Sequence, residues 1–150
     1  MKSQMWMGLL LMLTFLVNGC ANNSQVASPI PTAERLAIED KASLIAALEA
    51  AGAMVEAGEP ISQTFFTPEG SIIKVNSADV QVFEYNSSDE MENEASQVSS
   101  DGGSIGTSMV TWMDTPHFYK TGRIIVLYVG SDAAVLDLLE GTLGPQFAGR

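Results

Sequence analysis

A chain of 150 residues is long enough for one domain, since domains usually contain about 100–200 residues. It carries 7 Lys and Arg against 18 Asp and Glu, and the net charge of −11 disfavours nucleic-acid binding, which requires a basic surface. The single cysteine excludes an internal disulfide and a cysteine-built metal site, and the single histidine excludes any site that needs two.

The N-terminus has the pattern of an export signal. A positive charge at Lys2 precedes an apolar run from Met5 to Val17, which is too short to span a bilayer because a spanning helix needs about 20 apolar residues. The run leads into Val17-Asn18-Gly19-Cys20, which resembles the lipobox of bacterial lipoproteins: an aliphatic residue, any residue, a small residue and the lipidated cysteine. This resemblance implies that residues 1–19 are a lipoprotein signal peptide and that Cys20 is the lipidation site.

A lipid on Cys20 would hold the protein at a membrane. Each buried methylene contributes about 0.8 kcal/mol, so two or three acyl chains anchor a protein in practice permanently. Residues 20–33 would then be the lipidated cysteine and a flexible tether, because this stretch has two prolines, small polar residues and no charge. We expect an extracytoplasmic protein anchored in the cell membrane or the outer membrane. An ordinary secretory signal is the alternative, but it would leave a lone free thiol.

Residues 34–150 predict a single α+β domain. Its first helix is capped by Asp40 and ends at Gly52, with an apolar stripe that includes Leu44 and Leu48. Three strands follow, and in the third, Val80 and Val82 alternate with Phe83 and Tyr85. The ranges predicted for these strands are Ile61–Phe66, Ser71–Val75 and Asp79–Tyr85.

Residues 71–98 and residues 117–143 are both predicted to form a hairpin followed by a helix. A capping box at Ser87-Ser88-Asp89-Glu90 predicts a helix to about Val98. A glycine-rich loop over residues 99–107 leads to a strand at Ser108–Met113. A hairpin around Thr121-Gly122 then joins His117–Lys120 to Arg123–Val129, of which the apolar Ile124–Val129 is the expected central strand. The last helix is capped by Ser131 and ends at Gly144-Pro145. The predicted fold is an antiparallel β-sheet with about three helices packed mainly on one face.

Three stretches resemble an uncharacterised family of exported bacterial proteins. They are residues 105–112 (IGTSMVTW), residues 116–130 (PHFYKTGRIIVLYVG) and residues 143–149 (LGPQFAG). The resemblance covers about Leu44 to Arg150. It carries no known activity, so it assigns no catalytic residue.

Three polar patterns have a functional and a structural interpretation. His117, Asp114 and a serine suggest a hydrolytic triad, but no nucleophile-elbow motif accompanies them. The acidic run of Asp89, Glu90, Glu92 and Glu94 suggests a cation site, but its spacing matches no calcium loop and is typical of a solvated helix face. The glycine-rich loop at residues 101–106 leads to a strand, whereas phosphate loops lead to a helix N-terminus. We therefore expect no metal, no cofactor and no catalytic residue.

Aromatic side chains on the predicted strands are the candidate ligand or partner face: Phe83, Tyr85, Trp112, Tyr119 and Tyr128. If the helices cover one face of the sheet, some of these rings lie on the other face, where they would bind an envelope protein or an apolar ligand. The alternative is that the rings fill the core. The sequence thus favours a lipid-anchored binding module of the cell envelope. A small envelope hydrolase using His117 is the alternative, which a pocket gathering His117, Asp114 and a serine would support.

Overall fold

The computed structural model of the protein describes residues 37–149. The expected signal peptide, the lipidation site at Cys20 and the tether therefore lie outside the described residues. The compact unit that contains the described residues covers Arg35–Arg150. Among residues 37–149, no helix has both the length and the apolar character needed to cross a membrane.

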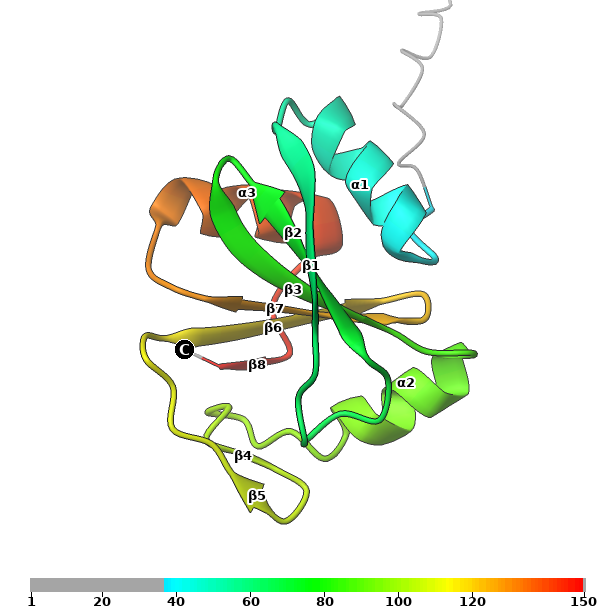
Figure 1. Ribbon diagram of the computed structural model, residues 1–150, viewed down its shortest axis with the longest axis vertical. Helices are drawn as coiled ribbons and strands as arrows, with labels where there is room; N and C mark the ends of the chain where they lie inside the picture. The colour runs from blue at the N-terminus through cyan, green and yellow to red at the C-terminus, as the bar shows by residue number, and fades with distance from the viewer. Residues whose placement is uncertain (1–36, 150) are drawn as a thin grey trace, which may run out of the picture. The chain divides into compact units, whose positions relative to one another are not determined.

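The described chain combines helices with an antiparallel sheet, which confirms the predicted α+β class (Figure 1). Six strands form one sheet in the order β1-β2-β3-β7-β6-β8, and β4 and β5 form a separate two-stranded hairpin. The helices are α1 (Lys41–Ala50), α2 (Ser88–Ala95) and α3 (Ala133–Leu143). The strands are β1 (Val55–Ile61), β2 (Gly70–Val75), β3 (Ala78–Glu84), β4 (Ser104–Ile105), β5 (Ser108–Met109), β6 (Pro116–Thr121), β7 (Ile124–Val129) and β8 (Ala148–Gly149).

Local polar signals define most helix ends. The Asp40 side chain accepts a hydrogen bond from the backbone N–H of Ser43, and Ser87 caps α2 in the same way, so both predicted caps are confirmed. The helix α2 ends at Ala95, earlier than predicted. The cap of α3 is Asp132 rather than Ser131, because the Asp132 carboxylate accepts from Ala134 N–H. As predicted, α3 ends at Gly144, whose φ of 90° suits glycine.

The first predicted strand is wrong. The extended segment is β1, and the chain turns through residues 62–69, where Phe65 and Phe66 pack inward from a loop. Gly58 and Pro60 lower the strand propensity of β1, but an edge strand tolerates both because only one of its sides is paired. A register shift between Ala57 and Pro60 marks a β-bulge at this edge. The predicted strand Ser108–Met113 is also shorter, since β5 ends at Met109.

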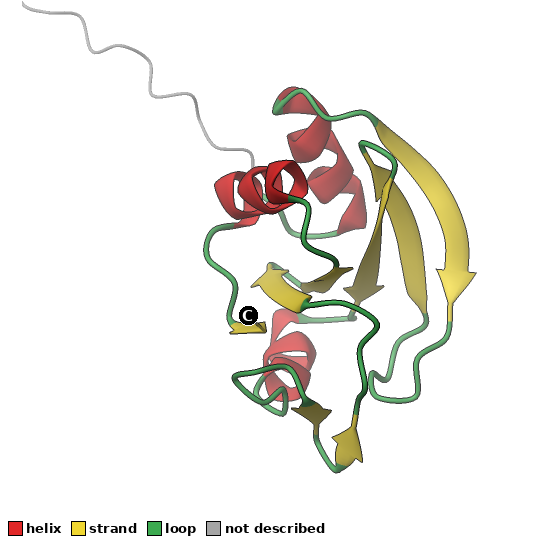
Figure 2. Ribbon diagram, turned by 90° about the vertical axis from the view of Figure 1, so that its left-hand side faces the viewer, coloured by secondary structure: helices red, strands yellow, loops and turns green. Residues whose placement is uncertain are grey.

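Both faces of the large sheet are covered. Successive residues of β7 belong to different cores, with Val126 in the α1/α3 core and Leu127 in the α2 core. Figure 2 shows two helices next to each other and the third well separated from them; α1 and α3 are the pair in contact. The helix α2 buries Met91 and Ala95 in the core that contains Leu127. The prediction that the helices pack mainly on one face of the sheet is therefore not confirmed. The α1/α3 core contains Ile38, Leu44, Leu48, Ala53, Ile73, Val75, Val80, Val82, Tyr119, Ile124, Val126, Tyr128, Val135 and Leu139. The α2 core contains Phe66, Phe83, Tyr85, Met91, Ala95, Ile105, Phe118, Ile125, Leu127 and Ala148.

Candidate functional site

The predicted exposed aromatic face is wrong. Phe83 and Tyr85 are buried in the α2 core, whereas Tyr119 and Tyr128 are buried in the α1/α3 core. The reason is that α2 and the Phe65–Phe66 loop cover the face that was expected to be open. Trp112 is the one predicted ring that stays half-buried, so it is the candidate that reaches the surface.

Trp112 is held rigidly at this surface. Its indole Nε1 donates a hydrogen bond to the carbonyl oxygen of Gly102 at 2.7 Å. The ring meets Phe65 and Phe118 edge to face, with both pairs of centroids 5.8 Å apart. These contacts fix the indole on three sides, so Trp112 offers a binding partner a ring that loses little conformational entropy.

Two open grooves lie on either side of the segment Val110–Trp112. The first, of about 400 Å³, has a mainly apolar lining and is called the apolar groove here; the second, of about 430 Å³, is called the acidic groove. The wall that they share is Val110, Thr111 and Trp112. The apolar groove is completed by Gln63, Phe65, Gln81, Met113 and Val129, and the acidic groove by Asp101, Gly103, Asp114, Thr115 and Pro116.

The shared wall has main-chain groups without protein partners. Val110 N–H donates to the Gly103 carbonyl at 3.0 Å, and this bond ties the start of the wall to the β4–β5 region. In the described part of the chain, Thr111 and Met113 form no hydrogen bond, and Trp112 forms only the bond from its indole. Because the wall belongs to neither sheet, its amide and carbonyl groups are available to water or to a bound molecule.

The charge around the grooves is negative. Asp101 and Asp114 line the acidic groove, and no Lys or Arg of residues 37–149 lines either groove. The described cations are engaged elsewhere: Lys74 with Asp79, Lys120 with Glu92, Arg123 with Asp40 and Glu84, and Lys41 with the Ser71 hydroxyl. Asp114 accepts hydrogen bonds from Thr115 N–H and the Ser131 hydroxyl.

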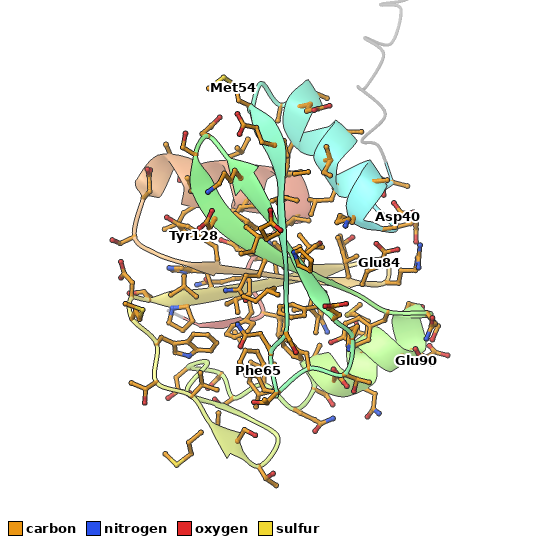
Figure 3. The ribbon with its side chains drawn as sticks, in the orientation of Figure 1. Asp40, Met54, Phe65, Glu84, Glu90 and Tyr128 are labelled. Carbon is orange, nitrogen blue, oxygen red and sulfur yellow. The ribbon has the colours of Figure 1, made fainter. Side chains whose placement is uncertain are left out.

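Arg123 organises the opposite part of the domain. Its guanidinium lies 2.7 Å from Glu84 and 3.5 Å from Asp40, two side chains that Figure 3 shows near each other. Hydrogen bonds from Ser43 lower the pKa of Asp40, and the charge of Arg123 lowers it further. This network joins the start of α1 to the β6–β7 turn, so it is a structural feature rather than a site.

His117 is held by structural hydrogen bonds. Its Nδ1 lies 2.8 Å from the Gln146 side-chain oxygen, and its Nε2 lies 3.1 Å from the Gly130 carbonyl oxygen. The imidazole is buried, and it stacks on Tyr128 with centroids 6.1 Å apart. Asp114 bonds instead to Thr115 N–H and the Ser131 hydroxyl. Neither His117 nitrogen contacts a serine or a carboxylate, so the residues of the suggested triad are not assembled.

The other polar patterns also have structural roles. Glu94 accepts hydrogen bonds from the hydroxyl of Tyr85, at 2.7 Å, and from the hydroxyl and backbone N–H of Thr67, which fastens the loop over residues 62–69 to α2. Burial raises the pKa of Tyr85, as does this bond to Glu94. Asp101 accepts from Ser99 and from Gly103 N–H within the glycine-rich loop, which leads to β4. Over residues 37–149, no group of three His, Cys, Asp or Glu side chains is arranged to hold a metal ion.

Sequence reasoning identified Trp112 but missed its neighbours. Phe65 was placed in a strand, and Met113 received no role, although it is fully exposed in a position where an apolar side chain gains nothing from folding. The sequence shows only that Met113 follows Trp112, and its exposure is visible only in the structure. Comparison with known proteins found no matching family model, no matching curated protein and no matching solved structure.

Proposed function

We propose that the protein is a lipid-anchored, extracytoplasmic binding module of the cell envelope, and that it binds its partner at the grooves on either side of Trp112. The observation that carries the proposal is the wall Val110–Trp112, which combines a rigid indole, unpaired main-chain groups and two adjoining grooves. Exposed methionines at positions 109 and 113 flank this wall. Apolar side chains that folding leaves in water favour a role in contacting another molecule.

The position of the grooves within the domain is compatible with an N-terminal anchor. The first described residues lie against the β6–β7 turn, where Thr121 donates to the Ile38 carbonyl and Arg123 N–H to the Glu39 carbonyl. The β4–β5 hairpin, which precedes the groove wall, lies at the lower end of the domain in Figure 1, away from α1. A partner therefore has access to the grooves without passing the start of the domain.

The anchor is tested by replacing its expected attachment atom. Cys20→Ser removes the only thiol of the chain, so metabolic labelling with a fatty acid should be lost and the protein should leave washed membranes. Ser24→Ala, which lies in the expected tether, is the matched control and should keep both the label and the membrane fraction. Unlabelled wild-type protein that is soluble after washing would contradict the lipid anchor.

The binding surface is tested by cross-linking in cells. A photoreactive residue at Met113 should give a discrete cross-linked product, because this side chain borders the apolar groove. The same residue at Met54 is the control, since Met54 is also exposed but lies at the top of the domain in Figure 3, whereas Phe65 lies in the lower half. No product at position 113, or equal products at both positions, would refute the groove as the binding surface.

The hydrolase alternative receives no support from this geometry. A triad needs a nucleophile within hydrogen-bond distance of the imidazole and an acid that orients the ring. The two ring nitrogens of His117 face an amide oxygen and a carbonyl oxygen instead. His117 is best explained as a residue that joins β6 to the turn before α3 and to the C-terminal segment.

A further inference from the structure

A third groove continues the apolar groove beyond Phe65. This groove, of about 380 Å³, is called the hydroxyl groove here, and Phe65 belongs to the lining of both grooves. The uncharged polar side chains that line it are Thr64, Thr67, Gln97, Thr107 and Ser108. Each groove has a volume within the range of about 300–1,000 Å³ that small-molecule sites have. A ligand longer than one groove therefore has room to extend from Trp112 past Phe65 to the β4–β5 hairpin.

The hydroxyl groove offers hydrogen-bonding groups that the fold leaves unused. The side-chain hydroxyls of Thr107 and Ser108 form no hydrogen bond with any described residue. Glu94 is the one charged side chain among the described residues that line this groove, and both of its oxygens accept hydrogen bonds, from Thr67 and from Tyr85. The groove therefore presents hydroxyl groups, which can both donate and accept, together with a carboxylate that already has partners.

The apolar groove places aromatic rings next to amide groups. The rings of Phe65 and Trp112 have centroids 5.8 Å apart, and the bond to the Gly102 carbonyl fixes the indole. Gln63 donates to Gln81 at 3.2 Å, which leaves each amide with further hydrogen-bonding capacity. None of the described residues that line this groove is charged. The groove therefore suits an uncharged ligand, because a charged group would lose its hydration there without gaining a partner.

An uncharged sugar chain matches both grooves. Each pyranose ring has a face of C–H groups, which packs on an aromatic ring, and a rim of hydroxyl groups, which pairs with hydroxyl and amide side chains. An N-acetyl substituent adds one donor, one acceptor and a methyl group. Every sugar unit carries both properties, whereas a peptide needs two different side chains to provide them. The net charge of −11 would repel an anionic polymer but not an uncharged glycan.

From these observations we propose that the apolar groove and the hydroxyl groove together bind an uncharged linear oligosaccharide of N-acetylated hexosamines. This inference rests on the binding surface proposed above and names the class of its ligand. Sugar rings pack on Phe65 and Trp112, and sugar hydroxyls bond to Thr107 and Ser108. Because these contacts lie in two adjoining grooves, one sugar unit does not reach both, and binding depends on the length of the sugar chain.

The experiment uses the full chain carrying Trp6→Phe, so that Trp112 is the one tryptophan and reports on the apolar groove by its fluorescence. The detergent is a polyoxyethylene ether, which contains no sugar. The probe is tetra-N-acetylchitotetraose. One control is N-acetylglucosamine, which changes only the length, and the other is chitotetraose without acetyl groups, whose amines are positively charged at about pH 6. At about 0.15 M salt, the probe should shift the Trp112 emission and bind at least about tenfold more tightly than either control.

Substitutions in the hydroxyl groove test its contribution separately from that of Trp112. Thr107→Val and Ser108→Ala each remove one hydroxyl without a change of charge, and each should weaken binding of the probe about two- to tenfold in titration calorimetry. Thr142→Val is the matched control, because Thr142 lies on α3 and lines a different pocket. This substitution should change binding less than about twofold. Urea unfolding of each variant checks that the domain is still folded.

Four outcomes would overturn this inference. Binding of the cationic sugar as tight as that of the probe would assign the interaction to the acidity of the chain, and equally tight binding of N-acetylglucosamine would show that the two grooves do not act together. Tighter binding of the capped peptide Leu-Ser-Leu-Ser-Leu would make the grooves a peptide site. If the probe leaves the Trp112 emission unchanged, the grooves do not bind such a sugar. Cross-linking from Met113 in cells then still decides whether they bind another partner, so the two proposals fail separately.

Discussion

Replacement of Leu127 by alanine tests whether both faces of the sheet are covered. Leu127 is fully buried in β7, where it pairs with Gln81 of β3 and Phe118 of β6. The substitution removes three carbons, which is about 2.4 kcal/mol of transfer free energy at about 0.8 kcal/mol for each. Because strands on both sides limit collapse into the space, the remaining cavity raises the expected loss of unfolding free energy to about 3–4 kcal/mol.

Urea unfolding of residues 34–150, followed through Trp112 fluorescence, measures this loss, since Trp6 lies outside the fragment. Leu138→Ala on α3 is the matched control: the same atoms are removed from a half-buried side chain, and alanine favours the helix, so the cost should be at most about half as large. A cost below about 1 kcal/mol for Leu127→Ala, or one no larger than that of Leu138→Ala, would refute the covered second face.

Three further predictions concern the boundaries, the turns and the pH dependence. The fragment 34–150 contains every described element and should unfold in one cooperative transition; a broad, non-cooperative transition in calorimetry would show that the boundary is wrong. Gly122→Ala should lower the free energy of unfolding in urea by more than about 1–2 kcal/mol, because φ is 52° and the new Cβ would lie 2.4 Å from the Glu39 Cα. The control Gly141→Ala has open space in a helix and should stabilise the protein by about 0.5–1 kcal/mol. Equal effects of the two substitutions would contradict the turn geometry. Burial and a bond to a carboxylate raise the pKa of Tyr85 above its usual 10.0, so the folded state holds this proton more tightly than the unfolded state. The contribution of Tyr85 to stability should therefore be constant up to about pH 10 and be lost above it, so stability should fall less steeply at alkaline pH in Tyr85→Phe. An unchanged alkaline slope in pH-dependent unfolding would remove this explanation.

Features that depend on neighbouring residues were predicted well. The caps at Asp40 and Ser87 need only a side-chain oxygen three residues before an N–H, which the sequence displays directly. The gap between the predicted strands Ser71–Val75 and Asp79–Tyr85 is the turn that connects β2 to β3, in which Asn76 and Ser77 have φ values of 51° and 75°. The uninterrupted apolar run Ile124–Val129 correctly predicted a central strand, since β7 lies between β3 and β6 in the sheet.

Features that depend on distant contacts were not predicted. Phe65 and Phe66 have high strand propensity, but they reach the α2 core from a loop, and that loop is fastened to Glu94. The groove next to Trp112 is formed where this loop meets the segment around Val110, a contact between parts of the chain far apart in sequence. The expected open aromatic face was wrong because it assumed that the helices cover one face of the sheet, whereas α2 and the Phe65–Phe66 loop cover the other.

The bulged strand β1 has a consequence for contacts between the sheet edges of two copies. A free sheet edge attracts the edge of a second copy, and the risk rises when copies are concentrated on a surface. The bulge between Ala57 and Pro60 disrupts the regular spacing of main-chain groups, and exposed Glu56 and Glu59 would face the same charges in a neighbour. The other end of the sheet is the two-residue strand β8, too short to template a ladder. Both described edges of the sheet therefore disfavour its extension from copy to copy.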